Sequence, residues 1–179
     1  QAEIQYHYLR ERLQGIHLEP ALLDAARGYL VATPKVQMLL DEQGVALAIA
    51  AMRQHYAAAP PDIICVDPIR NLFDGGPGGG TENDNHAMMF FLLERVERLR
   101  DAINPDAGVI LCHHTRKTTE DQLAEDPFMA LSGAGSLRSF YTSGIIMHRP
   151  DEERPERKLH FELRNGPGIE PKIIDKVDG

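Results

Sequence analysis

Tryptophan is missing from this sequence of 179 residues, and aromatic residues make up only 6% of it. The interior must therefore be built mainly from aliphatic side chains, which favours an α/β core of Ile, Leu, Val and Ala. No apolar run approaches the roughly 18 residues of a membrane-spanning helix, and the first residues lack the basic and apolar regions of a signal peptide. The sequence predicts a soluble, cytoplasmic protein with no membrane partner.

Cysteine is also scarce. Cys65 and Cys112 each lie within an apolar run, which predicts small core residues of a reduced protein and not a disulfide or metal ligands. Basic residues are outnumbered, with 19 Lys and Arg against 27 Asp and Glu and a formal net charge of -8. An acidic chain has no general electrostatic attraction to nucleic acid, so any DNA contact must come from a few local cations.

Helical and apolar patterns alternate along the first two thirds of the chain. The apolar runs at 63–66 and 108–112 do not alternate with polar residues, which predicts strands buried on both faces, as in parallel sheets. The end of the chain has hairpin-like spacing. We therefore expect one domain over 1–179, a mostly parallel sheet flanked by helices with an antiparallel, strand-rich C-terminal edge. The predicted helices are 3–14, 18–26, 44–57, 86–103 and 133–141, the further strands 29–33, 36–40, 143–148, 158–163 and 172–174, and the loops 73–85 and 118–127.

Polar side chains follow the two apolar strands at their carboxyl ends. Asp67 ends the first strand, and His113 and His114 follow the second. If the strands are neighbours, these side chains meet at the edge where open α/β sheets bind ligands. A carboxylate that holds magnesium beside a group that senses a terminal phosphate suits phosphoryl transfer. The alternatives are a plain strand end at Asp67, structural histidines, or a metal site, although adjacent strand residues point to opposite faces.

Five motifs occur together in one order along the chain. Together they resemble the RecA-like ATPase core, particularly that of RepA-type and DnaB-type hexameric replicative helicases. The resemblance covers nearly the whole sequence, and it rests on Ala2-Glu3 with Arg12-Leu13, Ile63–Pro68, His113–Lys117, Gly133–Arg138 and Arg164-Asn165-Gly166-Pro167.

The resemblance implies a role for each matched residue. Glu3 would activate the attacking water, Asp67 would hold Mg²⁺ through water beside ATP, and His113 or His114 would sense the γ-phosphate. Arg164 would reach the ATP of a neighbouring subunit as an arginine finger. The implied cofactors are ATP and Mg²⁺, and the implied partners are further copies of the chain in a ring, expected to be a hexamer.

The resemblance also implies contacts with single-stranded DNA. The two predicted loops fall where RecA-like proteins place DNA-contacting loops, but their own residues are acidic. Arg70 before the first loop, and Arg116 and Lys117 before the second, are the candidates for contacts with the DNA backbone.

Three departures from the family pattern affect these expectations. No Gly-x-x-x-x-Gly-Lys-Ser/Thr segment occurs, so the N-terminal strand, P-loop and helix of the fold are absent. We expect the chain to be a fragment whose P-loop lies upstream, and to have no ATPase activity alone. Glu162 stands where DnaB-type proteins have Lys, and Thr142 stands where some RepA-type sequences have a second Arg. Arg138 is predicted to be a solvated helix residue, and Arg164 has a plain hairpin role as its alternative.

The leading hypothesis is an ATP-hydrolysing RecA-like motor domain, a replicative DNA helicase of a plasmid, phage or mobile element. The alternative is a non-motor RecA-like module for assembly or regulation, with weak or no nucleotide hydrolysis. A third hypothesis is a metal-dependent hydrolase that uses Asp67 and the two histidines.

Overall fold

The computed structural model describes residues 5–16, 18–29, 38–131, 134–151 and 153–175. These divide into two compact units, one of Gln1–Gly79 with Phe90–His114, the other of Gly80–Met89 with Thr115–Gly179. Glu3, residues 30–33 and residues 36–37 lie outside the described residues. The described parts of the strands predicted over 29–33 and 36–40 do not form strands, because Tyr29 ends a helix and residues 38–40 have no regular secondary structure. The single domain over 1–179 stays a prediction.

The first unit begins with two helices, α1 (Tyr6–Gln14) and α2 (Pro20–Tyr29), close to the predicted bounds. Pro20 suits the first position of α2, because an N–H there has no partner within the helix. No residue of α1 is buried. Helix formation in this stretch was therefore predictable from its periodicity, whereas burial of its apolar side chains was not.

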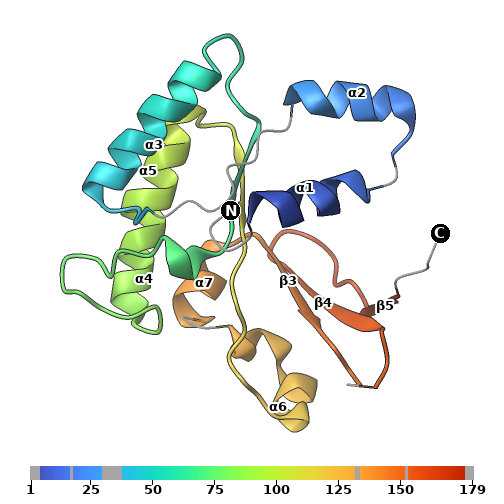
Figure 1. Ribbon diagram of the computed structural model, residues 1–179. Coiled ribbons are helices and arrows are strands. Elements are labelled where there is room, and N and C mark those ends of the chain that lie inside the picture. Colours follow the sequence, from blue (N-terminus) through green and yellow to red (C-terminus); the bar gives the residue numbers. More distant parts are fainter. Residues whose placement is uncertain (1–4, 17, 30–37, 132–133, 152, 176–179) are drawn as a thin grey trace. The chain divides into compact units, whose positions relative to one another are not determined.

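Helix α3 (Glu42–His55) starts at a side-chain cap, since Asp41 Oδ1 accepts a hydrogen bond from the Gly44 N–H at 2.8 Å. The long helix predicted over 86–103 is present as α4 (Asn85–Phe91), a π-helical stretch η2 (Leu92–Glu97) and α5 (Arg98–Ile103). Helices α3 and α5 run side by side (Figure 1). The buried side chains of this unit include Val45, Leu92, Val96 and Leu99.

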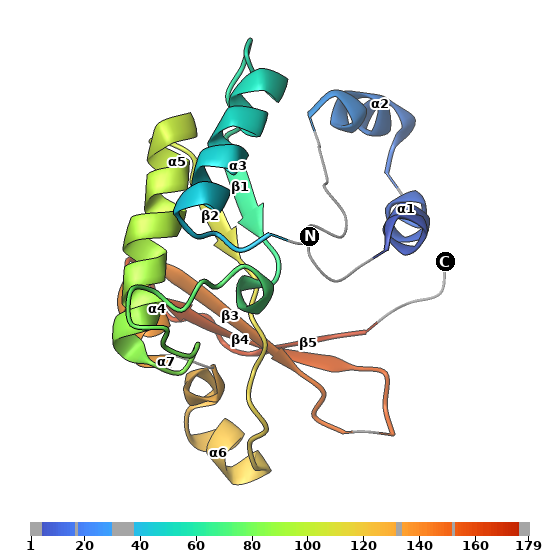
Figure 2. The same ribbon diagram turned by 60° about the vertical axis from the view of Figure 1, so that its left-hand side comes forward.

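Strands β1 (Ile63–Val66) and β2 (Gly108–Leu111) pair in parallel, with Ile63 opposite Gly108 and Val66 opposite Leu111. The arrows labelled β1 and β2 in Figure 2 point the same way. The prediction that these strands are neighbours is confirmed, and their carboxyl ends therefore lie at the same edge.

The prediction that these strands are buried on both faces is wrong. Along β1, Ile64 and Val66 are buried, whereas Ile63 is 61% exposed and Cys65 is exposed. On β2, Ile110 is 51% exposed. Because a strand points successive side chains to opposite faces, only one face of the pair is covered. The expectation that both cysteines are core residues fails for Cys65 for the same reason, and Cys112 is half-buried.

The second unit contains an antiparallel sheet of β3 (Ser143–His148), β4 (Arg157–Leu163) and β5 (Lys172–Ile174), in that order. These strands match the predicted positions within a residue or two. Helix α7 (Ala134–Phe140) precedes them, as predicted.

The prediction of a loop over 118–127 is wrong, because these residues contain the helix α6 (Glu120–Glu125). Thr119 and Gln122 form a capping box: the Gln122 N–H donates to the Thr119 hydroxyl, and the Thr119 N–H donates to Gln122 Oε1. This Thr-x-x-Gln pattern is the signal that sequence reasoning overlooked. A 3₁₀ turn, η3 (Pro127–Ala130), follows at once.

The glycine-rich stretch over 73–85 is irregular up to Asp84, as predicted, and its beginning is held by side chains. Gly75 and Gly76 both have positive φ, where a Cβ would be strained. Asp74 fixes this turn, because its carboxylate accepts from the Gly76 N–H at 3.1 Å and from Arg95 Nε at 2.9 Å. Asp74 is thus committed to the fold.

The protein is of the mixed α/β class, with a two-stranded parallel and a three-stranded antiparallel sheet among the described residues. The structure does not join them into the one mostly parallel sheet that was predicted. No helix within the described ranges is long and apolar enough to cross a membrane.

Candidate functional site

The candidate site in the first unit is the edge where β1 and β2 end. Beyond the strands, the Cys112 N–H donates to the Val66 carbonyl at 2.8 Å, and the Ile69 N–H donates to the Cys112 carbonyl at 2.9 Å. Asp67 lies between these two bonds in the chain, so its backbone is held beside the end of β2. The structure therefore places Asp67 next to the segment that continues into His113 and His114.

The side chains at this edge differ in access to solvent. Asp67 and His113 are half-buried, and both ring nitrogens of His113 are inaccessible, whereas His114 is exposed. The pKa of the Cys112 thiol is raised to about 11, first by burial and then by the neighbouring Cys65 thiol and Asp67 carboxylate. A thiol with so high a pKa stays protonated at neutral pH, so Cys112 is not a nucleophile here.

This edge does not assemble a metal site of three protein ligands. Among the described residues, no group of three or more His, Cys, Asp or Glu side chains is placed to hold a metal ion. The third hypothesis, a hydrolase with Asp67, His113 and His114 around one ion, therefore gains no support from the geometry. A magnesium ion held by one carboxylate, waters and nucleotide phosphates needs no such cluster.

The candidate DNA-binding cations lie on exposed positions. Arg70 lies in the first unit on the 3₁₀ turn η1 (Ile69–Asn71), which begins directly after Pro68. Arg116 and Lys117 are exposed in the second unit, where Arg116 Nη2 donates to the Met129 carbonyl at 2.6 Å. The guanidinium of Arg116 therefore stabilises the end of η3 in addition to being accessible.

An open pocket of about 350 Å³ lies beside Arg116 in the second unit. Two carboxylates, Glu125 and Asp126, share its wall with this one Arg. The mixture of charges makes the pocket a poor cradle for a phosphate, which needs convergent donors. Its remaining lining residues are Thr118, Gln122, Met129 and Ala130.

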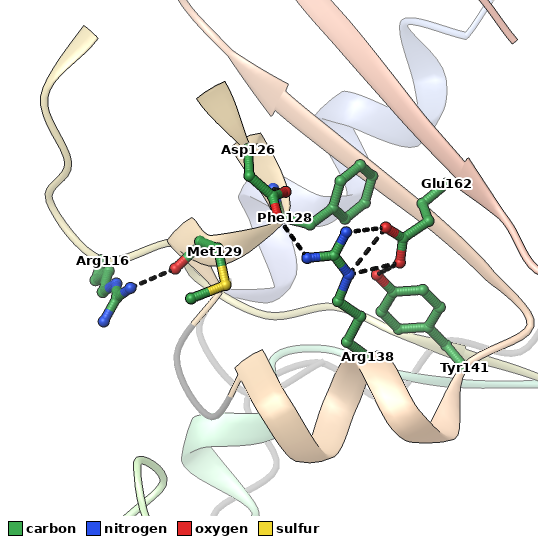
Figure 3. Close-up of polar contacts among 7 residues, drawn as sticks. All are labelled: Arg116, Asp126, Phe128, Met129, Arg138, Tyr141 and Glu162. Carbon is green, nitrogen blue, oxygen red and sulfur yellow. Dashed lines mark hydrogen bonds and ion pairs between the residues drawn. The ribbon is translucent and has the colours of Figure 1, made fainter. Parts of the chain in front are cut away.

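Arg138 is the centre of a polar cluster that connects α7, η3 and β4 (Figure 3). Its Nε donates to both carboxylate oxygens of Glu162, at 3.0 and 2.9 Å, and its Nη2 also contacts that carboxylate. Its Nη1 donates to Asp126 Oδ2 at 2.6 Å, and the guanidinium carbon lies 5.8 Å from the centre of the Phe128 ring. The prediction that Arg138 is merely solvated is wrong, because two carboxylates hold its charge.

The charges of this cluster shift one another. The hydrogen bond from Arg138 is the main reason that the pKa of Glu162 lies below its ordinary value, and Tyr141 adds an O–H donor at 2.7 Å. The pKa of Tyr141 is raised, first by burial and then by its bond to Glu162. Glu162 is thus a neutralised structural anion. No sequence pattern indicated this pairing, since Arg138 and Glu162 are separated by 24 positions.

Arg164 caps the end of α7. Its Nη2 donates to the carbonyls of Arg138 at 3.2 Å and Ser139 at 2.7 Å, and its backbone N–H donates to the Thr142 carbonyl at 2.9 Å. The last carbonyls of a helix lack partners within the helix, and a cation there is favourable. In this structure Arg164 therefore has a structural role as a helix cap, which differs from the plain hairpin role that was its alternative from the sequence.

Comparison of the sequence with models of protein families and with curated proteins finds no match.

Proposed function

We propose that the chain is the ATP-hydrolysing motor domain of a RecA-like protein, a replicative DNA helicase of a plasmid, phage or mobile element. The observation that supports this most is the parallel pair β1–β2 with Asp67 and His113-His114 at its carboxyl edge. Motor ATPases need a carboxylate and a phosphate-sensing side chain on adjoining strand ends, because the metal and the terminal phosphate are themselves in contact.

In this proposal Asp67 orients the waters of a bound Mg²⁺, and the metal supplies charge neutralisation for the phosphates. A side chain that senses the γ-phosphate must reach it from the protein surface. The exposed position of His114 favours it over His113, whose ring nitrogens are inaccessible. Glu3 as the residue that activates water, DNA contacts of Arg70, Arg116 and Lys117, and a hexameric ring remain parts of the proposal.

Arg164 favours the alternative of a non-motor RecA-like module. To act as an arginine finger, its guanidinium would have to give up the carbonyls of Arg138 and Ser139. Glu162 stands where DnaB-type proteins have Lys, so no second cation lies at that position beside Arg164. The Glu162 carboxylate is instead bonded to Arg138. A module that binds nucleotide without fast hydrolysis needs no finger, and it would leave these bonds intact.

The test is Mg²⁺-dependent ATP turnover by the protein expressed from its complete reading frame, compared between Asp67→Asn and Asp62→Asn. Asp62 is an exposed carboxylate at the opposite end of the same strand, so it controls for charge and for the strand itself. We expect Asp67→Asn to lower turnover at least about tenfold and Asp62→Asn to leave it unchanged, as for loss of one charge-stabilising group. Equal turnover in both variants contradicts the role of Asp67, and nucleotide binding without turnover in the unmodified protein favours the module.

A further inference from the structure

Two histidines that belong to none of the five motifs face each other across the β3–β4 hairpin. The register places Ile146 opposite His160 and His148 opposite Lys158, so His148 and His160 are diagonal neighbours on one face. Their Nε2 atoms are 3.1 Å apart, and their rings are inclined by 21° with centroids 5.2 Å apart. Both side chains are half-buried.

The contact between two imidazole nitrogens requires that one of them be deprotonated, since two N–H groups cannot share a hydrogen bond. The 3.1 Å contact thus contains a neutral imidazole nitrogen, which is the form that binds metals.

We propose that His148 and His160 form a two-imidazole binding site for a divalent transition-metal ion of the Ni²⁺ or Cu²⁺ type. At metal–nitrogen lengths of about 2.0–2.1 Å, a separation of 3.1 Å between the two nitrogens subtends about 95–102° at the ion. This angle is close to the right angle between neighbouring ligands in tetragonal and octahedral sites, which Ni²⁺ and Cu²⁺ adopt with nitrogen ligands.

The hairpin holds the two ligands at this spacing before an ion arrives. Six consecutive residue pairs connect β3 to β4, and the buried Ile146 anchors the same face. For both Nε2 atoms to bind an ion, each imidazole must turn about its Cβ–Cγ bond, and the ring whose Nε2 donates in the contact must move that proton to its own Nδ1 through solvent, so that both rings stay neutral. Among the described residues no third His, Cys, Asp or Glu side chain is placed to join these two as a ligand, so water would complete the coordination.

The test is calorimetric titration of the complete chain with Ni²⁺, together with NMR of the histidine ring nitrogens. We expect one ion per chain, selective broadening of the His148 and His160 signals, and affinity at least tenfold weaker in His148→Ala and in His160→Ala. His55→Ala, an exposed histidine on α3, is the matched control and should bind as the unmodified chain does. The NMR measurement needs no variant, so it decides the matter even if a substitution unfolds the hairpin.

Two results would overturn this site: no ion bound, or broadening confined to other histidines such as the adjacent His113 and His114. Lys158 provides a test of position, because the residue pairs with His148 in the register and its positive charge opposes a divalent cation. Lys158→Gln should therefore tighten Ni²⁺ binding several-fold. An unchanged affinity in that variant places the ion elsewhere and contradicts the proposal.

Discussion

Replacing Arg138 with Ala should destabilise the protein by about 2 kcal/mol. Arg138 bonds Glu162 through two nitrogens and Asp126 through a third. Charge-assisted hydrogen bonds are worth about 1.5–3 kcal/mol each when shielded. Here the side chains of Arg138, Glu162 and Asp126 are 35%, 30% and 35% exposed, so solvent screening reduces each ion pair to about 1 kcal/mol or less. The face of Phe128 adds about 0.5 kcal/mol.

The assay is urea denaturation of Arg138→Ala, Glu162→Gln and the double variant, which form a double-mutant cycle. Because the two residues contact directly, we expect a coupling energy of about 1 kcal/mol. Arg154→Ala is the control: that side chain is 68% exposed and pairs only locally with Asp151, so its loss should change stability by less than about 0.5 kcal/mol.

A coupling energy near zero would refute the reasoning, since it would mean that Arg138 and Glu162 contribute independently. So would an Arg138→Ala variant no less stable than Arg154→Ala. Either result would remove the ground for regarding Glu162 as a structural anion, and its charge would again be available to oppose a phosphate.

Two further predictions concern the same unit. A Cβ on Gly144 would lie 2.8 Å from the rings of both Phe128 and Tyr141, so Gly144→Ala should lower the free energy of unfolding by about 1–3 kcal/mol in urea denaturation. Gly78 has open space around it, so Gly78→Ala is the control and should change that free energy by less than about 0.5 kcal/mol. Equal effects of the two substitutions would contradict the packing around Gly144. The lowered pKa of Glu162 means that its stabilisation is complete above the ordinary carboxyl pKa and is lost as the pH falls through the folded value. Thermal melts from pH 6 to 3 should therefore show a smaller loss of Tm in Glu162→Gln than in the unmodified chain, and parallel curves would argue against it.

The elements that the sequence predicted well are those whose signals are local. The strand at 63–66 follows from four apolar residues between Pro61 and Asp67, and its end follows from Pro68, which has no N–H to continue the ladder. Helix α6 was not predicted, although its signal, the Thr119–Gln122 capping box, is equally local, because the polar and acidic composition of residues 118–127 is also typical of loops.

The burial of β1 and β2 shows what an apolar run leaves undetermined. Ile63 and Ile110 belong to apolar runs whose composition is typical of strands covered on both faces, yet both side chains are more than half exposed. A strand sequence without polar residues shows only that neither face of the strand has polar side chains that need solvent. Whether a face is covered depends on helices elsewhere in the chain, which the strand's own residues do not specify.

The same distinction separates the two halves of the candidate site. Asp67 and His113 could be placed from the sequence because each follows a strand directly, and parallel pairing then brings the strand ends together. Arg138 lies on a helix, Asp126 directly before a 3₁₀ turn and Glu162 on a strand, and their meeting depends on how these elements pack. The resemblance that assigned Arg164 to a neighbouring subunit's ATP carried no information about this packing. That packing gives Arg164 carbonyl partners on α7 and removes Glu162 as a free charge. The metal-side carboxylate is thus the part of the proposed motor that stands on the chain's own geometry, and the arginine finger is the part that requires a rearrangement.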